Sequence, residues 1–137
     1  MTRINIIPAS ELHDQHLIAE YREITMVPAA LRRTLNSKKG LDESKIPSTY
    51  TLNKGHVYFF YNKGAYLLKR YHEIISEMKI RGFNPDSKRK FPKDIFIDNN
   101  LYKDWNPNLE DFKVIRNRIE SKIKARPNWY RKTKVIK

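Results

Sequence analysis

The sequence predicts an all-α fold: a single compact domain of three main helices joined by long irregular connections. Apolar residues repeat with the 3.6-residue period of an amphipathic helix over residues 14–35, 62–82 and 106–127. The one continuous apolar run with strand character has no evident partner strand. With 137 residues, 39% of them hydrophobic, the chain can bury a core without disulfides, so we assign residues 1–137 to one domain.

The first helix is expected over residues 14–35. Its apolar positions follow helical spacing, and Asp14 is a candidate N-cap. Pro28 falls on the same stripe and has no N–H, which predicts a kink or break near Ile24–Val27. Glu23 and His16 are seven residues apart and point nearly the same way, beside the apolar stripe.

The connection that follows is rich in Ser, Lys, Gly, Asp, Pro and Asn between residues 36 and 55, which is typical of a loop. The apolar run 56–61 is interpreted as an extended buried connector. Asn62 is then the expected N-cap of the second helix, and Gly82 its stop. The region 83–105 contains prolines and a basic cluster and is predicted to be irregular, pinned to the body by aromatic side chains.

The third helix is expected to begin at residues 106–108, with Pro107 in its first turn, and to end at Pro127. Arg118 and Lys122 lie one turn apart on the same side of it. Trp129 and Tyr130 follow the helix and are flanked by cations.

The charge balance indicates the class of partner. The chain has 28 Lys and Arg residues against 15 Asp and Glu, a formal net charge of +13, which favours a polyanion and most commonly nucleic acid. A membrane surface is the second candidate partner, but the chain has no strongly amphipathic basic helix that would favour it. The absence of cysteine excludes disulfides, a thiolate nucleophile and thiolate metal sites. Neither a transmembrane-length apolar run nor a secretory h-region is present, so a soluble intracellular protein is expected.

The start of the chain carries the most reactive candidate group. A small residue at position 2 favours removal of Met1, which would leave Thr2 with a free α-amine. The pKa of such an amine is about 7.7–8.0, so part of it is an uncharged nucleophile near neutral pH. The neighbouring Arg3 would lower that pKa further. An amine of this kind can attack a sugar carbon and form an imine. On these residues alone, an ordinary chain start is the simpler interpretation.

Other candidate side chains also have two interpretations. From periodicity alone, Glu23 is an ordinary surface glutamate. His13 and His16 share a helix face, but a third ligand and the H-E-x-x-H spacing are missing, so no metal site is predicted. Polar contacts to phosphate or base edges suit Gln15 and His16 better.

Two further groups of residues suit nucleic acid. In a chain of net charge +13, phosphate contacts by Arg118 and Lys122 are favoured over a merely solvated helix face. Trp129 and Tyr130 suit base stacking and a hydrophobic plug that seats the tail equally well.

Several segments of the chain carry a specific combination of residues: Thr2-Arg3-Ile4-Asn5, Asp14-Gln15-His16-Leu17, Ala19-Glu20-Tyr21-Arg22-Glu23, Gly55-His56-Val57 with Phe59-Phe60-Tyr61, Arg81-Gly82-Phe83, and Arg126-Pro127 with Trp129-Tyr130. This combination resembles the pyrimidine-dimer DNA glycosylase/AP lyase family, the bacteriophage endonuclease V-like enzymes. The resemblance extends from the first residue to about Tyr130 and is poor between about Asp86 and Asn106. Met26 stands where the phage enzyme of this family has an arginine, and the tail after Tyr130 is basic where that enzyme has aromatics.

The resemblance implies an all-α fold in which the N-terminal segment is threaded between the helices. It implies a bifunctional DNA repair enzyme, an N-glycosylase and AP lyase, that excises the 5′ base of cyclobutane pyrimidine dimers in UV-damaged duplex DNA and then cleaves the strand by β-elimination. Thr2 would supply the imine-forming amine and Glu23 the catalytic carboxylate, with no metal or cofactor. DNA contacts are implied for Arg3, Gln15, His16, Arg22, Arg118, Lys122, Trp129 and Tyr130.

Two alternatives remain open from the sequence. The same chemistry could act on other damaged bases, such as ring-opened purines, or the chain could be a non-catalytic basic DNA-binding protein. Nothing in the sequence argues for an oligomer, so a monomer is expected.

Overall fold

The computed structural model describes residues 3–86 and 88–133, and the regular elements in this part of the chain are helices. The described residues form four long helices: α1 (Asp14–Glu23), α2 (Met26–Leu35), α4 (Gly64–Ile80) and α6 (Leu109–Ala125). Shorter elements are η1 (Ala9–Glu11), η2 (Glu43–Lys45), α3 (His56–Phe59) and α5 (Asp94–Asp98). The described residues contain one isolated β-bridge and no named strand. The predicted all-α class is confirmed.

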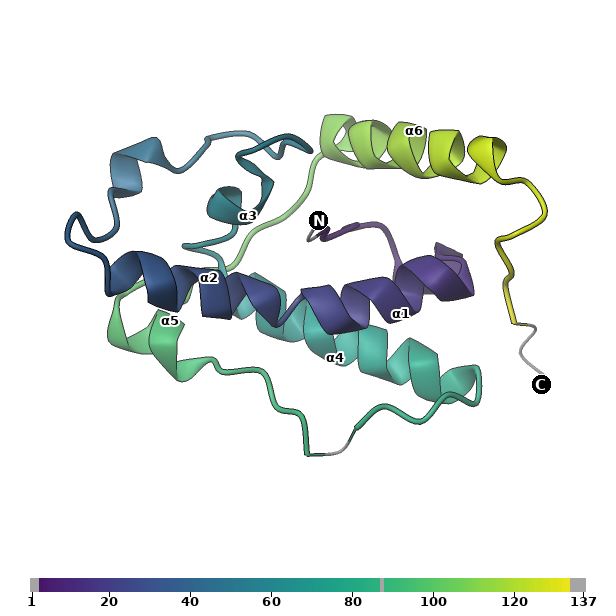
Figure 1. The fold of residues 1–137 in the computed structure, drawn as a ribbon, viewed down its shortest axis with the longest axis horizontal. Coiled ribbons are helices and arrows are strands. Elements are labelled where there is room, and N and C mark those ends of the chain that lie inside the picture. The colour runs from purple at the N-terminus through teal and green to yellow at the C-terminus, as the bar shows by residue number, and fades with distance from the viewer. Residues whose placement is uncertain (1–2, 87, 134–137) are drawn as a thin grey trace.

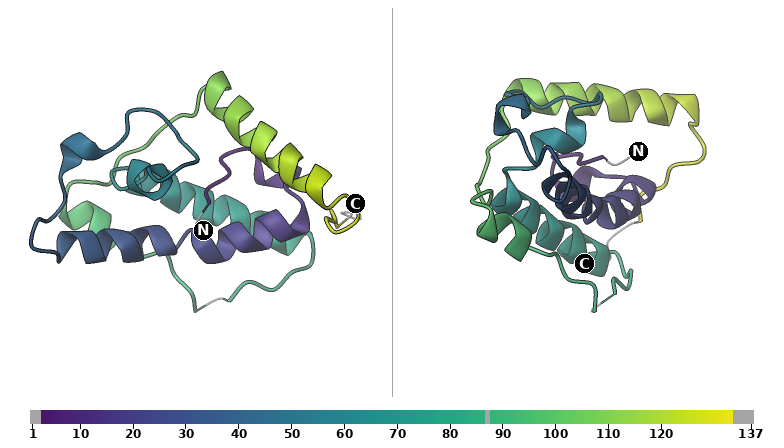
Figure 2. Two further views of the ribbon diagram at one scale, coloured as in Figure 1. Left: turned by 45° about the horizontal axis from the view of Figure 1, so that its top comes forward. Right: turned by 60° about the vertical axis from the view of Figure 1, so that its left-hand side comes forward.

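The helices pack around the N-terminal segment, which is described from Arg3 onward. Helix α1 packs against α4, and α2 contacts α3 and α5. The N-terminal segment runs between α6 and the α1–α4 pair, as the resemblance implied (Figure 1). Figure 2 shows the same arrangement from two further directions. Ile4, Ile6 and Ile7 of this segment belong to the hydrophobic core, so the segment is an internal element rather than a surface tail.

The predicted break in the first helical stretch is confirmed. Helix α1 ends at Glu23 and α2 begins at Met26, so the residues between them redirect the chain. Pro28 lies in the first turn of α2, where its missing N–H would have no intrahelical partner. The predicted N-cap was wrong: His13 precedes the helix, and the Asp14 carboxylate instead accepts hydrogen bonds from Arg81 and from Thr133.

The predicted extended connector at residues 56–61 was wrong. Residues His56–Phe59 form α3, and the chain continues in turns to Tyr61. The side chains of His56, Phe59, Phe60 and Tyr61 are buried. A continuous apolar run is compatible with a buried strand or a buried helical turn, and periodicity alone cannot separate them.

The start of α4 is also shifted from the predicted Asn62, because Lys63 is the N-cap. The first N–H groups of α4 donate to the carbonyls of Leu101 and Lys103, so the chain beyond α5 satisfies this helix end. Gly64 is packed so closely that a Cβ there would lie 2.4 Å from Cγ of Phe96.

Gly82 ends α4 as predicted, with a positive φ of 88°. The N–H of Phe83 donates to the Met78 carbonyl and the N–H of Gly82 to that of Lys79, the bond pattern of a Schellman motif. Helix α6 begins one residue after Asn108, which forms a capping box with Asp111. Pro107 therefore precedes the cap rather than lying in the first turn.

The region 83–105 is less irregular than predicted, because it contains α5. Phe91 and Phe96 are buried and pin it to the body, whereas Tyr102 is 37% exposed. No helix among the described residues has the length and apolar character that crossing a membrane would require.

Candidate active site

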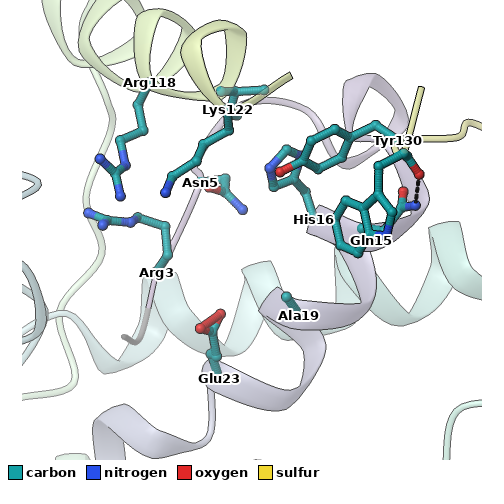
Figure 3. Close-up of a pocket in the computed structure, with 11 residues that line it drawn as sticks. Arg3, Asn5, Gln15, His16, Ala19, Glu23, Arg118, Lys122 and Tyr130 are labelled. Atoms are coloured by element: carbon teal, nitrogen blue, oxygen red, sulfur yellow. Dashed lines mark hydrogen bonds between the residues drawn. The ribbon is translucent and has the colours of Figure 1, made fainter. Parts of the chain in front are cut away.

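The candidate site is a pocket of about 340 Å³ between α1, α6, the N-terminal segment and the chain that follows α6 (Figure 3). Residues 3–23 and residues 118–130, which lie far apart in the sequence, therefore converge on it. The residues that line it are Arg3, Asn5, Gln15, His16, Ala19, Glu23, Arg118, Ile119, Lys122, Trp129 and Tyr130.

Helix α1 presents one face to this pocket. His16, Ala19 and Glu23 follow one another at helical spacing, whereas the adjacent Leu17 and Ile24 are fully buried in the core. Ala19 has the smallest side chain of the three. It leaves the space between His16 and Glu23 open for a ligand.

Among the described residues, Glu23 is the one carboxylate that lines the pocket. Its side chain is half-buried and faces Arg3 across the cavity (Figure 3). Burial raises the pKa of Glu23, an effect that the positive charge of Arg3 opposes in part. A carboxylate with a raised pKa is a better proton acceptor at neutral pH than an ordinary surface glutamate.

Three cations face the same space. Arg118 and Lys122 project from α6 into the pocket, toward Arg3 on the N-terminal segment (Figure 3). Arg3 donates a hydrogen bond of 2.8 Å from Nη1 to the Leu52 carbonyl, which fixes its direction. Burial and the nearby charge of Arg118 lower the pKa of Arg3. Like charges gathered at one cavity are stabilised when an anion enters between them, so the pocket suits a phosphate.

The aromatic wall of the pocket is held by α1. Tyr130 stacks on His16, with ring centroids 4.7 Å apart and planes 16° apart. Gln15 donates to the Trp129 carbonyl and accepts a 3.0 Å bond from the N–H of Arg131. Both ends of the Gln15 amide are thus engaged with the backbone of the C-terminal segment. This side chain seats the aromatic residues rather than pointing freely at a ligand.

His13 and His16 have the properties of neutral aromatic side chains. Burial lowers the pKa of His16, and the charge of His13 lowers it further. The Nδ1 atoms of both rings have no hydrogen-bond partner among the described residues. Among all the residues that the structure describes, no cluster of three or more His, Cys, Asp or Glu side chains could hold a metal ion.

The structure brings together most of the predicted site. Glu23 and seven of the eight residues for which the resemblance implied DNA contact line this one pocket. The exception is Arg22, which is exposed on α1 and whose carbonyl accepts a hydrogen bond from Arg89. Thr2, the predicted nucleophile, lies outside the described residues. Its role therefore remains a prediction.

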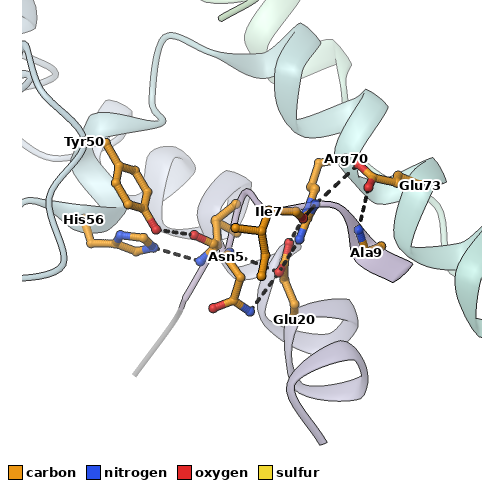
Figure 4. A network of polar contacts seen from close by, with 9 residues as sticks. Asn5, Ile7, Ala9, Glu20, Tyr50, His56, Arg70 and Glu73 are labelled. Atoms are coloured by element: carbon orange, nitrogen blue, oxygen red, sulfur yellow. Dashed lines mark hydrogen bonds and ion pairs between the residues drawn. The ribbon is translucent and has the colours of Figure 1, made fainter. Parts of the chain in front are cut away.

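The sequence interpretation missed the buried polar network that fixes the N-terminal segment (Figure 4). Glu20 is fully buried and accepts hydrogen bonds from the N–H and the side chain of Asn5, at 3.0 and 2.9 Å. Arg70 pairs with the same carboxylate through Nε at 2.6 Å and Nη2 at 2.9 Å, and also donates to the Ile7 carbonyl. Ile6, which lies between Asn5 and Ile7 in the chain, has a positive φ of 52°. A β-branched residue adopts this angle only when its surroundings impose it.

A signal for this network was present in the sequence. Glu20 lies between Leu17 and Ile24 at helical spacing, and Arg70 lies in the same way between Leu67 and Ile74. A charged residue on an apolar stripe must find a partner if the stripe is buried. Two such residues of opposite charge, on two helices, are therefore candidates for a buried ion pair.

One comparison with known proteins bears on this geometry. The family model described as pyrimidine dimer DNA glycosylase matches residues 1–91, about two thirds of the chain. The matched range includes the N-terminal segment, all of α1 with Glu23, and the α4 residues that hold the segment in place.

Proposed function

The chain belongs to the pyrimidine dimer DNA glycosylase family, and on this premise we propose that it excises the 5′ base of cyclobutane pyrimidine dimers and then cleaves the strand as an AP lyase. The observation that carries the proposal is the pocket itself. It gathers one partly buried carboxylate, three cations and two aromatic side chains where the N-terminal segment lies between α1 and α6. Such a site suits a charged sugar–phosphate with an adjoining base.

The first step uses the Thr2 amine after Met1 has been removed. The amine forms a bond to C1′ of the 5′ nucleotide, the bond from C1′ to the base breaks, and the departing base takes up the proton that the amine releases. The bond between C1′ and the ring oxygen O4′ then breaks, O4′ takes up the second proton of the amine, and an imine between the protein and C1′ remains. Glu23 offsets the positive charge that develops on the sugar during this step.

The second step uses Glu23 as a base. It accepts a proton from C2′ of the imine, the bond between C3′ and its phosphate oxygen breaks, and the 3′ phosphate leaves. The raised pKa of Glu23 suits this transfer, because a base is most effective when its pKa approaches the working pH. Water then hydrolyses the imine and frees the amine.

The remaining side chains of the pocket bind the substrate. Arg3, Arg118 and Lys122 contact phosphates, and Trp129 and Tyr130 stack on exposed bases. A damaged, poorly stacked dimer lowers the cost of kinking the duplex and extruding a base, so the protein recognises the lesion through its deformability. Gln15 contributes by holding the aromatic wall in place.

Borohydride trapping tests the proposal directly. The processed protein is incubated with a duplex that contains one defined dimer, and borohydride reduces any imine to a stable adduct that mass spectrometry assigns to Thr2. Glu23→Gln should abolish strand cleavage while binding to the damaged duplex survives. Matched duplexes with a ring-opened purine, or with no damage, identify the substrate. Salt-dependent binding without an adduct on any duplex would identify a non-catalytic DNA-binding protein.

A further inference from the structure

The peptide of Ile4 is held from both sides by buried side chains that lie about 50 residues away in the sequence. Nε2 of His56 accepts the Ile4 N–H at 2.8 Å, and the hydroxyl of Tyr50 donates to the Ile4 carbonyl at 2.6 Å (Figure 4). The neighbouring Arg3 donates to the Leu52 carbonyl in the same region. The segment that begins at Arg3 is therefore docked on residues 50–56 as well as on α1 and α4.

The hydrogen bonds of His56 define its tautomer. Its Nδ1 lies 2.8 Å from the Thr51 carbonyl, which can only accept, so Nδ1 carries the proton. Nε2 then presents a lone pair to the Ile4 N–H. The ring is 2% exposed and is packed edge-on against Tyr50 and Phe60. Its position and its neutral state are both fixed by its surroundings.

His56 does not line the pocket, so it cannot contact the reacting sugar. It acts on the backbone two residues after Thr2, and at about 3.3–3.6 Å per residue the amine therefore stays within about 7 Å of Ile4. Displacement of a nucleophile by about 1 Å can lower a reaction rate by about 100-fold. The hydrogen bond that the Ile4 N–H donates to His56 therefore limits the displacement of the amine.

We propose that His56 is a positioning residue for the N-terminal amine: by accepting the Ile4 N–H it fixes the segment that begins at Arg3 beside the pocket that Glu23 lines. The inference rests on the proposed function, because it assigns His56 a role in the same imine chemistry. Tyr50 supplies the second hold on the same peptide.

The test compares His56→Leu, which cannot accept the bond, with His56→Gln, whose amide oxygen can. Single-turnover borohydride trapping on dimer-containing duplex measures the rate of imine formation, and a separate titration measures the Kd. His56→Leu should trap at least about 10-fold more slowly with a Kd within about threefold of the native value, as expected from displacement of a nucleophile. His56→Gln should recover most of the rate. Ile74→Val, a buried change on α4, is the control for general loosening of the core.

Each outcome decides the question. Equal rates for His56→Leu and the native protein, or equal losses in His56→Leu, His56→Gln and Ile74→Val, would overturn the positioning role while leaving the proposed function intact. Failure of the native protein to form any adduct would instead remove the proposed function, and this inference with it. Should His56→Leu not fold, nitrogen NMR of the native imidazole still applies: an Nε2–H tautomer would contradict the inference.

Discussion

Replacement of Arg70 by methionine is the sharpest test of how the site is built. The guanidinium of Arg70 is buried and donates two hydrogen bonds, of 2.6 and 2.9 Å, to the fully buried Glu20 carboxylate. Methionine retains the apolar stem and removes the charge. Glu20 would keep its two bonds from Asn5 but would carry an uncompensated charge in the core.

The size of the effect follows from this geometry. Breaking a buried ion pair by removing one partner costs about 3–5 kcal/mol, because the remaining charge stays desolvated. The Ile7 carbonyl also loses its partner, so a loss of about 4 kcal/mol is expected for Arg70→Met. With a urea m-value of about 2 kcal/mol/M, the unfolding midpoint would fall by about 2 M. Such a loss is a large part of the roughly 5–15 kcal/mol that stabilises a domain of ordinary size.

Urea unfolding, monitored by circular dichroism, measures the loss in the free energy of unfolding. Two further variants show whether the buried charge causes it. Lys69→Met removes a neighbouring but exposed cation, paired with Asp104 at the surface, and should cost no more than about 1 kcal/mol. Glu20→Gln combined with Arg70→Met removes both buried charges and should be more stable than Arg70→Met alone. A loss below about 1 kcal/mol in Arg70→Met, or a double variant no more stable than Arg70→Met, would refute the reasoning.

Three further outcomes are expected. Arg118→Ala and Lys122→Ala should each weaken binding to damaged duplex and lower the slope of log K against log salt by about one charge, measured by fluorescence anisotropy. The free energy of unfolding should fall by up to about 3 kcal/mol as the pH drops from 6.5 toward 4, because burial lowers the pKa of His56 to about 4 and only the unfolded imidazole takes up the proton. Gly64→Ala should lower the thermal midpoint through a loss of about 1–3 kcal/mol, since the new Cβ would collide with Phe96.

Each of these outcomes has a control. Lys113→Ala, an exposed change on α6 outside the pocket, should leave the salt slope closer to native than the pocket variants do. An unchanged slope in the Arg118 and Lys122 variants would mean that those cations only solvate their helix. His56→Gln should flatten the acid dependence, and an equally steep loss in that variant would assign it to other groups. A native melting curve for Gly64→Ala would show that α5 can move away from α4.

The helices could be predicted because their signals are local. Apolar periodicity located the main helical stretches, the position of Pro28 predicted the break between α1 and α2, and Gly82 predicted the end of α4. The errors arose where tertiary contacts replaced local ones. The first N–H groups of α4 use backbone carbonyls from residues 101–103 instead of a cap at Asn62, and a buried helical turn occupies the apolar run at His56.

The candidate site, like the fold, could be predicted from the sequence only in part. The sequence by itself determined the chemistry that is available: a basic chain without cysteine, a glutamate beside the first apolar stripe, cations one turn apart on the last helix, and a pattern of residues that resembles one family. Residue type and helical spacing suffice for this, because neither depends on distant parts of the chain.

Only the tertiary structure decided which of these groups meet. It brought Arg3, Glu23, Arg118 and Tyr130 to one pocket, left Arg22 outside it, and engaged both ends of the Gln15 amide with the C-terminal backbone. It also joined Glu20 to Arg70 across 50 residues. The physical reason is that a buried donor or acceptor must be satisfied by whichever group the packing places beside it, and sequence spacing does not record that neighbour.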